Sequence, residues 1–382
     1  MTDSKSKLIT VSHCKSWKIN HGSTHFSITE KGGQLLPQFY FSKNKKPINP
    51  YFIAPWSTDK NEYPKAPVLN PLRGDFFCMP FAGSDRPVNG VYYLPHGESS
   101  YARWKGPTTH KQSSVQKTDF LLSIKKNKGT ILKRITTQQN QTAFLTEHRL
   151  NGFQDPMTFG HHPNLLLPQN SSALLSKSPY LFGQVFTQAE KPAQGGYSSL
   201  KSGALFEALE KVPLNNGGYA DLTQLPFNTG FTEVVTVASD PRFPLAWTTL
   251  LFPDEGFLWF SIKKTAVLPT SVIWIQDGGR HYPPWNSIRG IVGLEETCGL
   301  VDGLATSLEP NPFSKKGVPT FKKLASNEEY CIEFLQGVTL VPKGFEKVEQ
   351  VEIQKETLLF IDRKNKKIRM PLGELLTPFI SA

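Results

Sequence analysis

The chain has 382 residues, of which 38% are hydrophobic and 20% are charged, and its formal net charge is +11. This composition excludes global disorder, because the apolar content is sufficient for a sizeable core. No stretch approaches the roughly 18 consecutive apolar residues of a membrane helix. Aromatic residues make up 12%, and there are 30 Pro and 29 Gly, a combination that favours strands separated by turns.

Strand-like runs recur along the whole chain. They are short, rich in aromatic and β-branched residues, and bounded by Gly, Pro, Asn or Asp. They predict strands over residues 25–30, 35–41, 118–125, 130–137, 142–150, 233–238, 245–252, 257–263, 271–276, 290–296, 329–335 and 357–362. Helical periodicity is sparse, and its best match is 200–212, where Leu205, Leu209 and Val212 are spaced four and three residues apart.

The organisation of the chain predicts one domain over residues 1–382. No repeat of fixed period is visible, which disfavours a propeller or a solenoid, and no polar low-complexity linker divides the sequence. So many strands in one domain favour an all-β fold of two large stacked, mainly antiparallel sheets with few short helices.

Three short basic clusters stand out, at residues 43–46, 125–128 and 363–367. Nucleic-acid binding is one interpretation, but no recognisable nucleic-acid motif accompanies them. Each cluster lies between alternating apolar runs, so the favoured interpretation is the tip of a hairpin. A third interpretation is a negatively charged small substrate, such as a sugar phosphate, a uronate or a sulfosugar, which the net charge would steer.

The cysteines and the first residues of the chain bear on the cellular compartment in which the protein is expected. Cys14, Cys78, Cys298 and Cys331 form no CxxC pair and no cluster with zinc-like spacing, so no metal site is expected. The first residues, MTDSKSKLITVSH, lack the apolar run of a secretory signal. We therefore expect a cytoplasmic protein with reduced thiols that neither enters a membrane nor binds nucleic acid. The oligomeric state is not predicted.

Two pairs of adjacent polar residues are candidates for chemistry. His162 precedes Pro163, so it is expected to be extended and to direct its ring opposite to that of His161. In the predicted strand 290–296, Glu295 and Glu296 point to opposite faces. Gly293 shares the face of Glu295 and leaves space beside it, which makes Glu295 the better site candidate. Taken alone, each pair is more typical of a structural role than of a catalytic one.

Further polar residues lie beside glycine and aromatic residues, a mixture typical of sugar sites. Arg73 precedes a Phe-rich segment, and His96 is followed by Gly97. Arg280 and His281 belong to an aromatic, basic stretch just before the Glu295 strand. That stretch is interpreted either as a wall of the cleft that meets an anionic group or as a packed Pro/Trp loop.

The order of these segments resembles the aldose 1-epimerase (galactose mutarotase) superfamily over most of the chain. The matching pieces, in order, are Gly32-Gly33 between two strands, Arg73 before Met79-Pro80-Phe81, His96-Gly97, His162-Pro163-Asn164-Leu165 and Gly293-Leu294-Glu295. The resemblance implies a β-supersandwich and the interconversion of sugar anomers in carbohydrate metabolism, without a metal or organic cofactor. It implies that His162 protonates the ring oxygen, that Glu295 deprotonates the anomeric hydroxyl, and that Arg73 and His96 contact the sugar.

The sequence also departs from the family pattern. Asn164 follows the His-Pro pair where the family usually has an aromatic residue, and Glu296 stands where proline is frequent. The family's aspartate has no clear counterpart, with Asp221 and Asp277 as the candidates. Two alternatives therefore remain. One is a non-catalytic carbohydrate-binding or regulatory protein on the same fold. The other is a different carbohydrate-active enzyme, a lyase or a hydrolase, and a hydrolase would normally need a second carboxylate.

Overall fold

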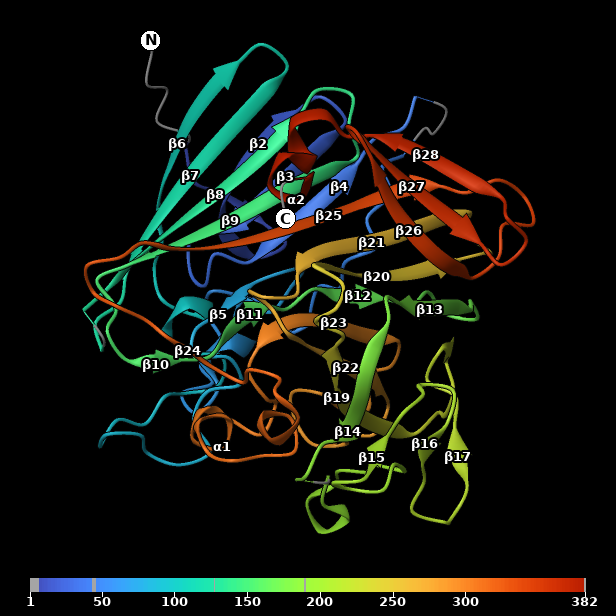
Figure 1. Cartoon of the computed structure of the whole chain (residues 1–382). Helices are drawn as coiled ribbons and strands as arrows, with labels where there is room; N and C mark the ends of the chain where they lie inside the picture. Colours follow the sequence, from blue (N-terminus) through green and yellow to red (C-terminus); the bar gives the residue numbers. More distant parts are fainter. Residues whose placement is uncertain (1–6, 43–45, 127, 189, 381–382) are drawn as a thin grey trace.

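Two large sheets contain most of the regular structure in the computed structural model, which describes residues 7–42, 46–126, 128–188 and 190–380 (Figure 1). The first has nine strands in the order β18 (Gln224–Leu225), β13 (Ala173–Lys177), β20 (Leu245–Phe252), β21 (Phe257–Lys264), β25 (Tyr330–Leu340), β9 (Ala143–Asn151), β8 (Thr130–Gln138), β7 (Val115–Ser123) and β6 (Lys105–Gln112).

The second large sheet has eight strands and carries the candidate site. Its order is β15 (Leu205–Phe206), β14 (Tyr180–Val185), β19 (Phe231–Ser239), β22 (Thr270–Asp277), β23 (Ile291–Cys298), β11 (Phe159–His161) and β5 (Phe77–Cys78), and β12 (Asn164–Leu166) also pairs with β23. The strand pairings that build this sheet are antiparallel. Within it, β23 pairs with β22 on one side and with β11 and β12 on the other.

Smaller elements complete the fold. A four-stranded N-terminal sheet contains β1 (Ile9–Val11), β2 (Cys14–His21), β3 (Thr24–Thr29) and β4 (Leu35–Phe39), and a C-terminal sheet contains β26 (Val348–Gln354), β27 (Thr357–Asp362) and β28 (Lys367–Pro371). Two short pairs join β10 (Pro156–Met157) to β24 (Lys322–Lys323) and β16 (Val212–Pro213) to β17 (Tyr219–Ala220). The α-helices are α1 (Leu304–Leu308) and α2 (Thr377–Ile380), and no helix of the described residues could span a membrane.

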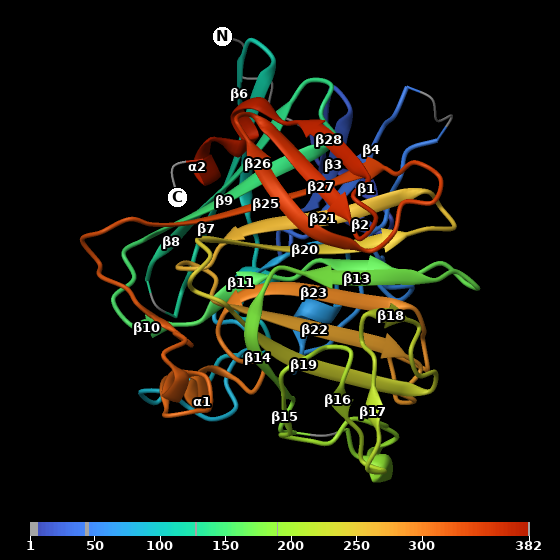
Figure 2. The same ribbon diagram turned by 45° about the vertical axis from the view of Figure 1, so that its right-hand side comes forward.

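The nine-stranded sheet is covered on both faces, which explains the nearly continuous burial of β20 and β21. One face packs on the eight-stranded sheet and on the N-terminal sheet, where the Phe39 and Phe144 ring centroids are 6.3 Å apart. The C-terminal strands lie across the other face (Figure 2), with the rings of Phe260 and Phe360 5.0 Å apart. The main core therefore lies between the two large sheets.

The predicted all-β fold and each of its predicted strands are confirmed, with boundaries shifted by a few residues; 245–252 coincides with β20. The predicted helix at 200–212 is wrong. That segment forms turns and the short strands β15 and β16, and its backbone groups bond to other segments, as in Leu222 N–H to Leu209 O. Leu209 and Val212 are buried, but Leu205 is 48% exposed, so the three do not form one buried stripe.

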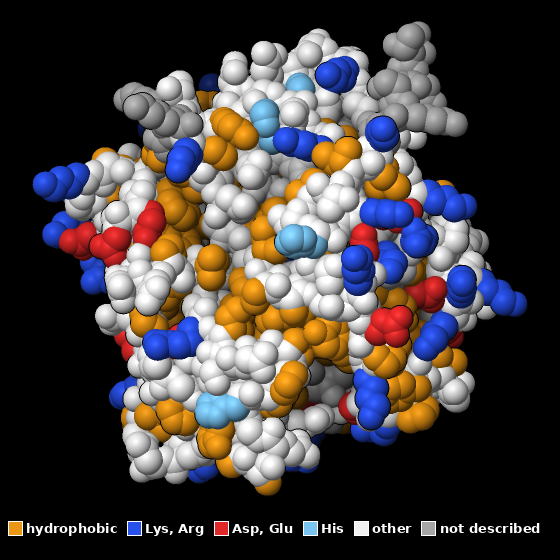
Figure 3. Space-filling view, turned by 180° about the vertical axis from the view of Figure 1, so that it is seen from behind, with side chains coloured by type: hydrophobic (Ala, Val, Ile, Leu, Met, Phe, Trp, Pro, Cys, Tyr) orange, Lys and Arg blue, Asp and Glu red, His pale blue; other side chains and the backbone are white. Residues whose placement is uncertain are grey.

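Two of the basic clusters lie at hairpins, as predicted. In the cluster 363–367, residues 363–366 join β27 to β28 and Lys367 begins β28; the Asp362 carboxylate accepts hydrogen bonds from the Lys364 and Lys366 amides. The described part of 125–128 joins β7 to β8, while Asn127 lies outside the described residues. In the first cluster, residues 43–45 also lie outside them. On the face seen from behind, Lys and Arg side chains are most frequent on the right-hand side of the view, where Asp and Glu side chains lie among them (Figure 3).

Candidate active site

The two adjacent histidines point to opposite faces of the eight-stranded sheet, as their extended conformation predicts. His161 ends β11 and faces the space between the large sheets, where its Nδ1 is 3.2 Å from the Asp75 carboxylate. His162 faces outward into a pocket of about 130 Å³. Asp75 also accepts a hydrogen bond of 3.1 Å from the backbone N–H of His162, which fixes the chain at this point.

The two adjacent glutamates of β23 separate in the same way. Glu296 faces the space between the sheets, 2.5 Å from Lys263 Nζ and 3.5 Å from Lys177 Nζ. Glu295 faces the pocket, and its Oε1 is 3.3 Å from Nε2 of His162. The side chains of Glu295 and His162 are 4% and 7% exposed, so the structure brings the two predicted catalytic groups together in a nearly dry site.

Burial determines the protonation of this pair. It raises the pKa of Glu295 well above its usual value, and the neighbouring Glu296 carboxylate raises it further. Burial also lowers the pKa of His162 well below its usual value, with a smaller contribution in the same direction from His96. Both shifts favour the uncharged forms, a protonated Glu295 beside a neutral His162.

His96 borders the same pocket and is held in an unusual backbone conformation. Its φ is +61°, and Gly97 follows at +70°. A Cβ atom at Gly97 would lie 1.9 Å from the Met79 carbonyl oxygen, so only glycine fits there. The His96 ring lies 4.9 Å from the His162 ring, and its Nδ1 lies 3.3 Å from the Cys78 sulfur. Burial lowers the pKa of His96 to about 4, so this ring is neutral at physiological pH.

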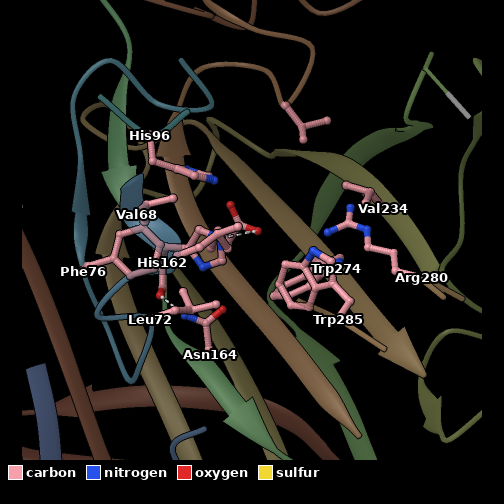
Figure 4. Close-up of a pocket in the computed structure, with 13 residues that line it drawn as sticks. Val68, Leu72, Phe76, His96, His162, Asn164, Val234, Trp274, Arg280 and Trp285 are labelled. Atoms are coloured by element: carbon pink, nitrogen blue, oxygen red, sulfur yellow. Dashed lines mark hydrogen bonds and ion pairs between the residues drawn. The ribbon is translucent and has the colours of Figure 1, made fainter. Parts of the chain in front are cut away.

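Aromatic and aliphatic side chains form the walls (Figure 4). Phe76 stacks on the His162 ring at 4.6 Å. The indole of Trp274 lies over Gly293, where an added Cβ would be 3.0 Å from its Cε3 atom. The predicted space beside Glu295 is thus filled largely by this ring. Aliphatic lining is supplied by Val68, Leu69, Leu72, Val234 and Val301.

Arg280 is the cationic member of the lining. Its guanidinium lies 5.1 Å from the Trp285 ring and 5.6 Å from the Trp274 ring. Its Nε donates to the Glu190 carboxylate at 2.7 Å. The terminal nitrogens are turned into the cavity, toward the side that holds His162 (Figure 4). The aromatic stretch before β23 therefore forms one wall of the pocket.

Two other predicted contacts do not reach this lining. The guanidinium of Arg73 is buried elsewhere and donates to the backbone of Val11 and Ser12 and to the Ser57 hydroxyl. Arg73 therefore anchors the β1–β2 hairpin, and its placement disagrees with a sugar contact. His281 is exposed and packs against Tyr197 at 4.7 Å, outside the pocket. Asp277 is also outside, paired with Arg289.

Asn164 and Trp274 line the pocket but were not among the predicted site residues. Asn164 is two residues from His162, and a spacing of two in an extended segment places both side chains on one face. That spacing could have identified it. Trp274 pairs with Gly293 in the β22–β23 register, a relationship that becomes visible only when the strand partners are known.

Four buried polar atoms around the pocket have no hydrogen-bond partner among the described residues: Asn164 Oδ1, Trp274 Nε1, His162 Nδ1 and Glu295 Oε2. Buried polar atoms are nearly always paired, and unpaired ones are frequent at functional sites. The pocket therefore offers donors and acceptors to a polar ligand. Among the described residues, no three His, Cys, Asp or Glu side chains are grouped as a metal site.

Comparisons with known proteins concern the fold. No protein-family model matches the chain, and no curated protein matches its sequence. Solved structures do match. A candidate aldose 1-epimerase from Escherichia coli K12 has a TM-score of 0.55 at 13% identity, covering 85% of this chain and 99% of its own. A candidate aldose 1-epimerase from Klebsiella pneumoniae has a TM-score of 0.56 at 13% identity, with coverage of 86% and 80%.

A third structure, a galactose mutarotase related enzyme from Lactobacillus acidophilus, has a TM-score of 0.52 at 13% identity and covers 86% of this chain and 99% of its own. At identities this low, the structural similarity establishes the fold and leaves the activity open. The resemblance read from the ordered sequence segments is thus supported by structure. The chain has the galactose mutarotase-like fold.

Proposed function

We propose that this protein interconverts the anomers of a sugar by opening and reclosing the ring. The observation that supports this most strongly is the contact between His162 Nε2 and Glu295 Oε1, 3.3 Å apart on the floor of a buried pocket. An acid and a base side by side, in a pocket with unpaired polar atoms, suit a reaction that moves two protons.

The chemistry balances without a co-reactant. The base takes the proton of the anomeric hydroxyl, and C1=O1 forms as the C1–O5 bond breaks. The acid gives its proton to O5, which leaves the open-chain aldehyde. Rotation about C1–C2 turns the other face of the carbonyl toward the hydroxyl, and the reverse transfers close the ring to the second anomer. Each positioned proton transfer contributes about 10²–10⁴-fold in rate.

The direction of transfer depends on where the pair holds its proton. The family resemblance assigns the acid to His162 and the base to Glu295. Burial favours the proton on Glu295 in the resting site, which would make Glu295 the first acid and His162 the first base. The two arrangements contain the same number of protons and differ by one transfer across the 3.3 Å contact. A step in the reverse direction exchanges the roles again.

The substrate class that we propose is a hexose or hexose derivative. His96 and Arg280 border the cavity and would contact the substrate in addition to the acid–base pair. Arg280 gives a negatively charged sugar a partner, since its forked guanidinium suits carboxylate, phosphate and sulfonate groups. Glu295 is the single carboxylate of the lining, all of which is described, so a hydrolase with two flanking carboxylates is less well supported.

A non-catalytic sugar-binding protein on this fold is the second candidate. It is favoured by the direct contact between His162 Nε2 and Glu295 Oε1, because these two atoms are engaged with each other rather than turned to a substrate. On that hypothesis the buried pair stabilises the pocket, and a sugar binds above it without reaction.

Anomer exchange measured by NMR tests the proposal on neutral, phosphorylated, uronic and sulfonated hexoses. We expect faster exchange for one class, reduced at least 100-fold in His162→Ala and in Glu295→Gln. The matched control is His110→Ala, since His110 is exposed on the edge strand β6. Binding without exchange would support the second candidate. Equal exchange in the wild type and both pocket variants would reject the proposed catalytic roles.

A further inference from the structure

Two uncharged polar groups border the pocket beyond the acid–base pair, and both have fixed directions. The Asn164 side chain is fully buried, and its Nδ2 donates to Gly74 O at 3.0 Å and to His162 O at 3.1 Å. Both amide hydrogens are therefore engaged, which determines the orientation of the carboxamide. Its Oδ1 is turned away from these partners, toward the Trp274 side of the cavity (Figure 4), and accepts no hydrogen bond from any described residue.

Trp274 supplies the complementary group. Its side chain is buried, and its Nε1–H has no acceptor among the residues that the structure describes. The ring is held in place by contacts on two sides, with Gly293 beneath it and the Trp285 ring 5.4 Å away. An indole N–H can only donate, so it is able to pair with an acceptor on a ligand.

The strand register places these two groups on either side of one residue. Asn164 pairs with Gly293 in β12–β23, and Gly293 pairs with Trp274 in β22–β23. The three residues form a row across the sheet, and directly opposite residues point to the same face. The middle residue has no side chain, and the Trp274 ring lies over it. A ligand that packs against this ring therefore has the Asn164 amide oxygen on one side of Gly293 and the indole on the other. Glu295 lies two residues further along the same face of β23.

We propose that Asn164 and Trp274 form a hydroxyl-reading pair, in which Asn164 Oδ1 accepts a hydrogen bond from the ligand and Trp274 Nε1 donates one. The proposal rests on the proposed function in that the ligand is a sugar. A hydroxyl both donates and accepts, whereas a carbonyl only accepts and an ammonium only donates. A neutral acceptor paired with a neutral donor therefore selects sugars that carry hydroxyls next to the reacting end, and selects against the corresponding deoxy sugars.

The test is a comparison of dissociation constants by titration calorimetry. The probes are D-glucose, D-galactose, D-glucose 6-phosphate and D-glucuronate, followed by the 2-, 3-, 4- and 6-deoxy forms of the tightest binder. We expect at least one deoxy form to bind about 10- to 100-fold more weakly, because it leaves a buried polar atom unpaired. The position of that deoxy group would identify the hydroxyl that is read.

Trp274→Phe keeps an aromatic wall and removes the N–H. We expect this variant to bind the parent sugar about 10- to 100-fold more weakly than the wild type does, and to bind the sensitive deoxy sugar with an unchanged dissociation constant. Asn164→Ala should likewise weaken binding of the parent sugar and leave unchanged the binding of the sugar that lacks the hydroxyl contacted by Asn164. The melting temperature of this variant is measured to verify folding. The matched control is Trp285→Phe, which alters the neighbouring wall and should weaken parent and deoxy sugars by equal factors.

Two results would overturn the proposal. In one, every deoxy sugar binds as tightly as the parent. In the other, Trp274→Phe weakens all sugars equally, so that the indole acts only as a wall. Anomer exchange recorded on the same samples separates this proposal from the proposed function. Deoxy discrimination without exchange supports the hydroxyl-reading pair and rejects the epimerase, and exchange without discrimination has the opposite meaning. A lack of binding by every parent sugar rejects both.

Discussion

Glu295 and Glu296 are consecutive residues of β23, but their carboxyl groups have opposite pKa shifts. Burial alone would raise the pKa of Glu296, yet Lys177 and Lys263 outweigh it and lower that pKa to about 2. The contact of Glu295 is the neutral ring of His162, so burial prevails and its pKa is raised well above the usual value. An ionised carboxylate that joins two sheets thus adjoins a carboxyl whose burial within the pocket favours its protonated form.

Glu295→Gln should stabilise the fold increasingly as the pH rises. The folded pKa of Glu295 lies above its unfolded value of 4.5, so its contribution is fully present below pH 4.5 and is lost as the pH rises toward the folded pKa. Glutamine does not titrate and loses nothing. Urea unfolding between pH 4.5 and 8 should show that the free energy of unfolding of the variant, relative to that of the wild type, increases by up to about 1.4 kcal/mol per pH unit. A difference that does not change with pH would contradict the raised pKa.

Glu296→Gln should have the opposite effect on stability. It leaves the ammonium groups of Lys177 and Lys263 buried without their carboxylate partner, and breaking such a pair typically costs about 3–5 kcal/mol. Chemical denaturation at pH 7 measures this loss. The matched control is Glu333→Gln, which breaks a partly exposed Lys264–Glu333 pair between β21 and β25 and should cost less than about 1 kcal/mol. Equal losses in both variants would contradict a special role for the buried pair.

The local alternation of these side chains could be predicted from the sequence. A strand has a period of two, so His161 and His162, or Glu295 and Glu296, must separate to opposite faces once each segment is known to be extended. Glycine beside Glu295 marked the glutamate that borders the pocket, whereas proline after His162 predicted only the extended backbone, and the family resemblance selected His162. The strands themselves were recognisable because aromatic and β-branched residues alternate between clear turn signals.

The contacts that depend on distant segments could not be predicted in this way. Arg73 follows the family order, but its hydrogen-bond partners belong to the β1–β2 hairpin, about 60 residues earlier. The spacing within 200–212 matched a helix, but pairing with other segments outweighed that local preference. Trp274 was missed because its role depends on the register between β22 and β23, which no local pattern specifies.

Gly97→Ala should disrupt the position of His96. The new methyl group would lie 1.9 Å from the Met79 carbonyl oxygen, in addition to the strain of a φ of +70°. Gly90→Ala is the matched control, because Gly90 has a φ of +75° but nothing within 4 Å of an added Cβ. We expect a loss of about 1 kcal/mol in the free energy of unfolding for the control and about 3 kcal/mol or more for Gly97→Ala. Similar losses would show that backbone strain alone matters.

Arg280→Gln should weaken the binding of negatively charged sugars more than that of neutral sugars. The terminal nitrogens of Arg280 face the cavity, whereas its Nε is held by Glu190 at 2.7 Å. We expect about a tenfold loss for glucuronate or glucose 6-phosphate relative to glucose, since a charge-assisted hydrogen bond is removed. Glu190→Gln should act in the opposite direction and strengthen anion binding, because Glu190 competes for the same guanidinium.

Arg289→Gln provides the control for net charge in the same titrations. Arg289 is about half-exposed and pairs with Asp277 outside the pocket, so its loss changes the total charge by the same amount as the loss of Arg280. If attraction by the whole protein dominates, the two arginine variants will weaken anionic sugars equally. If contact within the pocket dominates, Arg280→Gln alone will lower the preference and Glu190→Gln will raise it. Arg280 would then be the residue through which this pocket distinguishes a charged sugar from a neutral one.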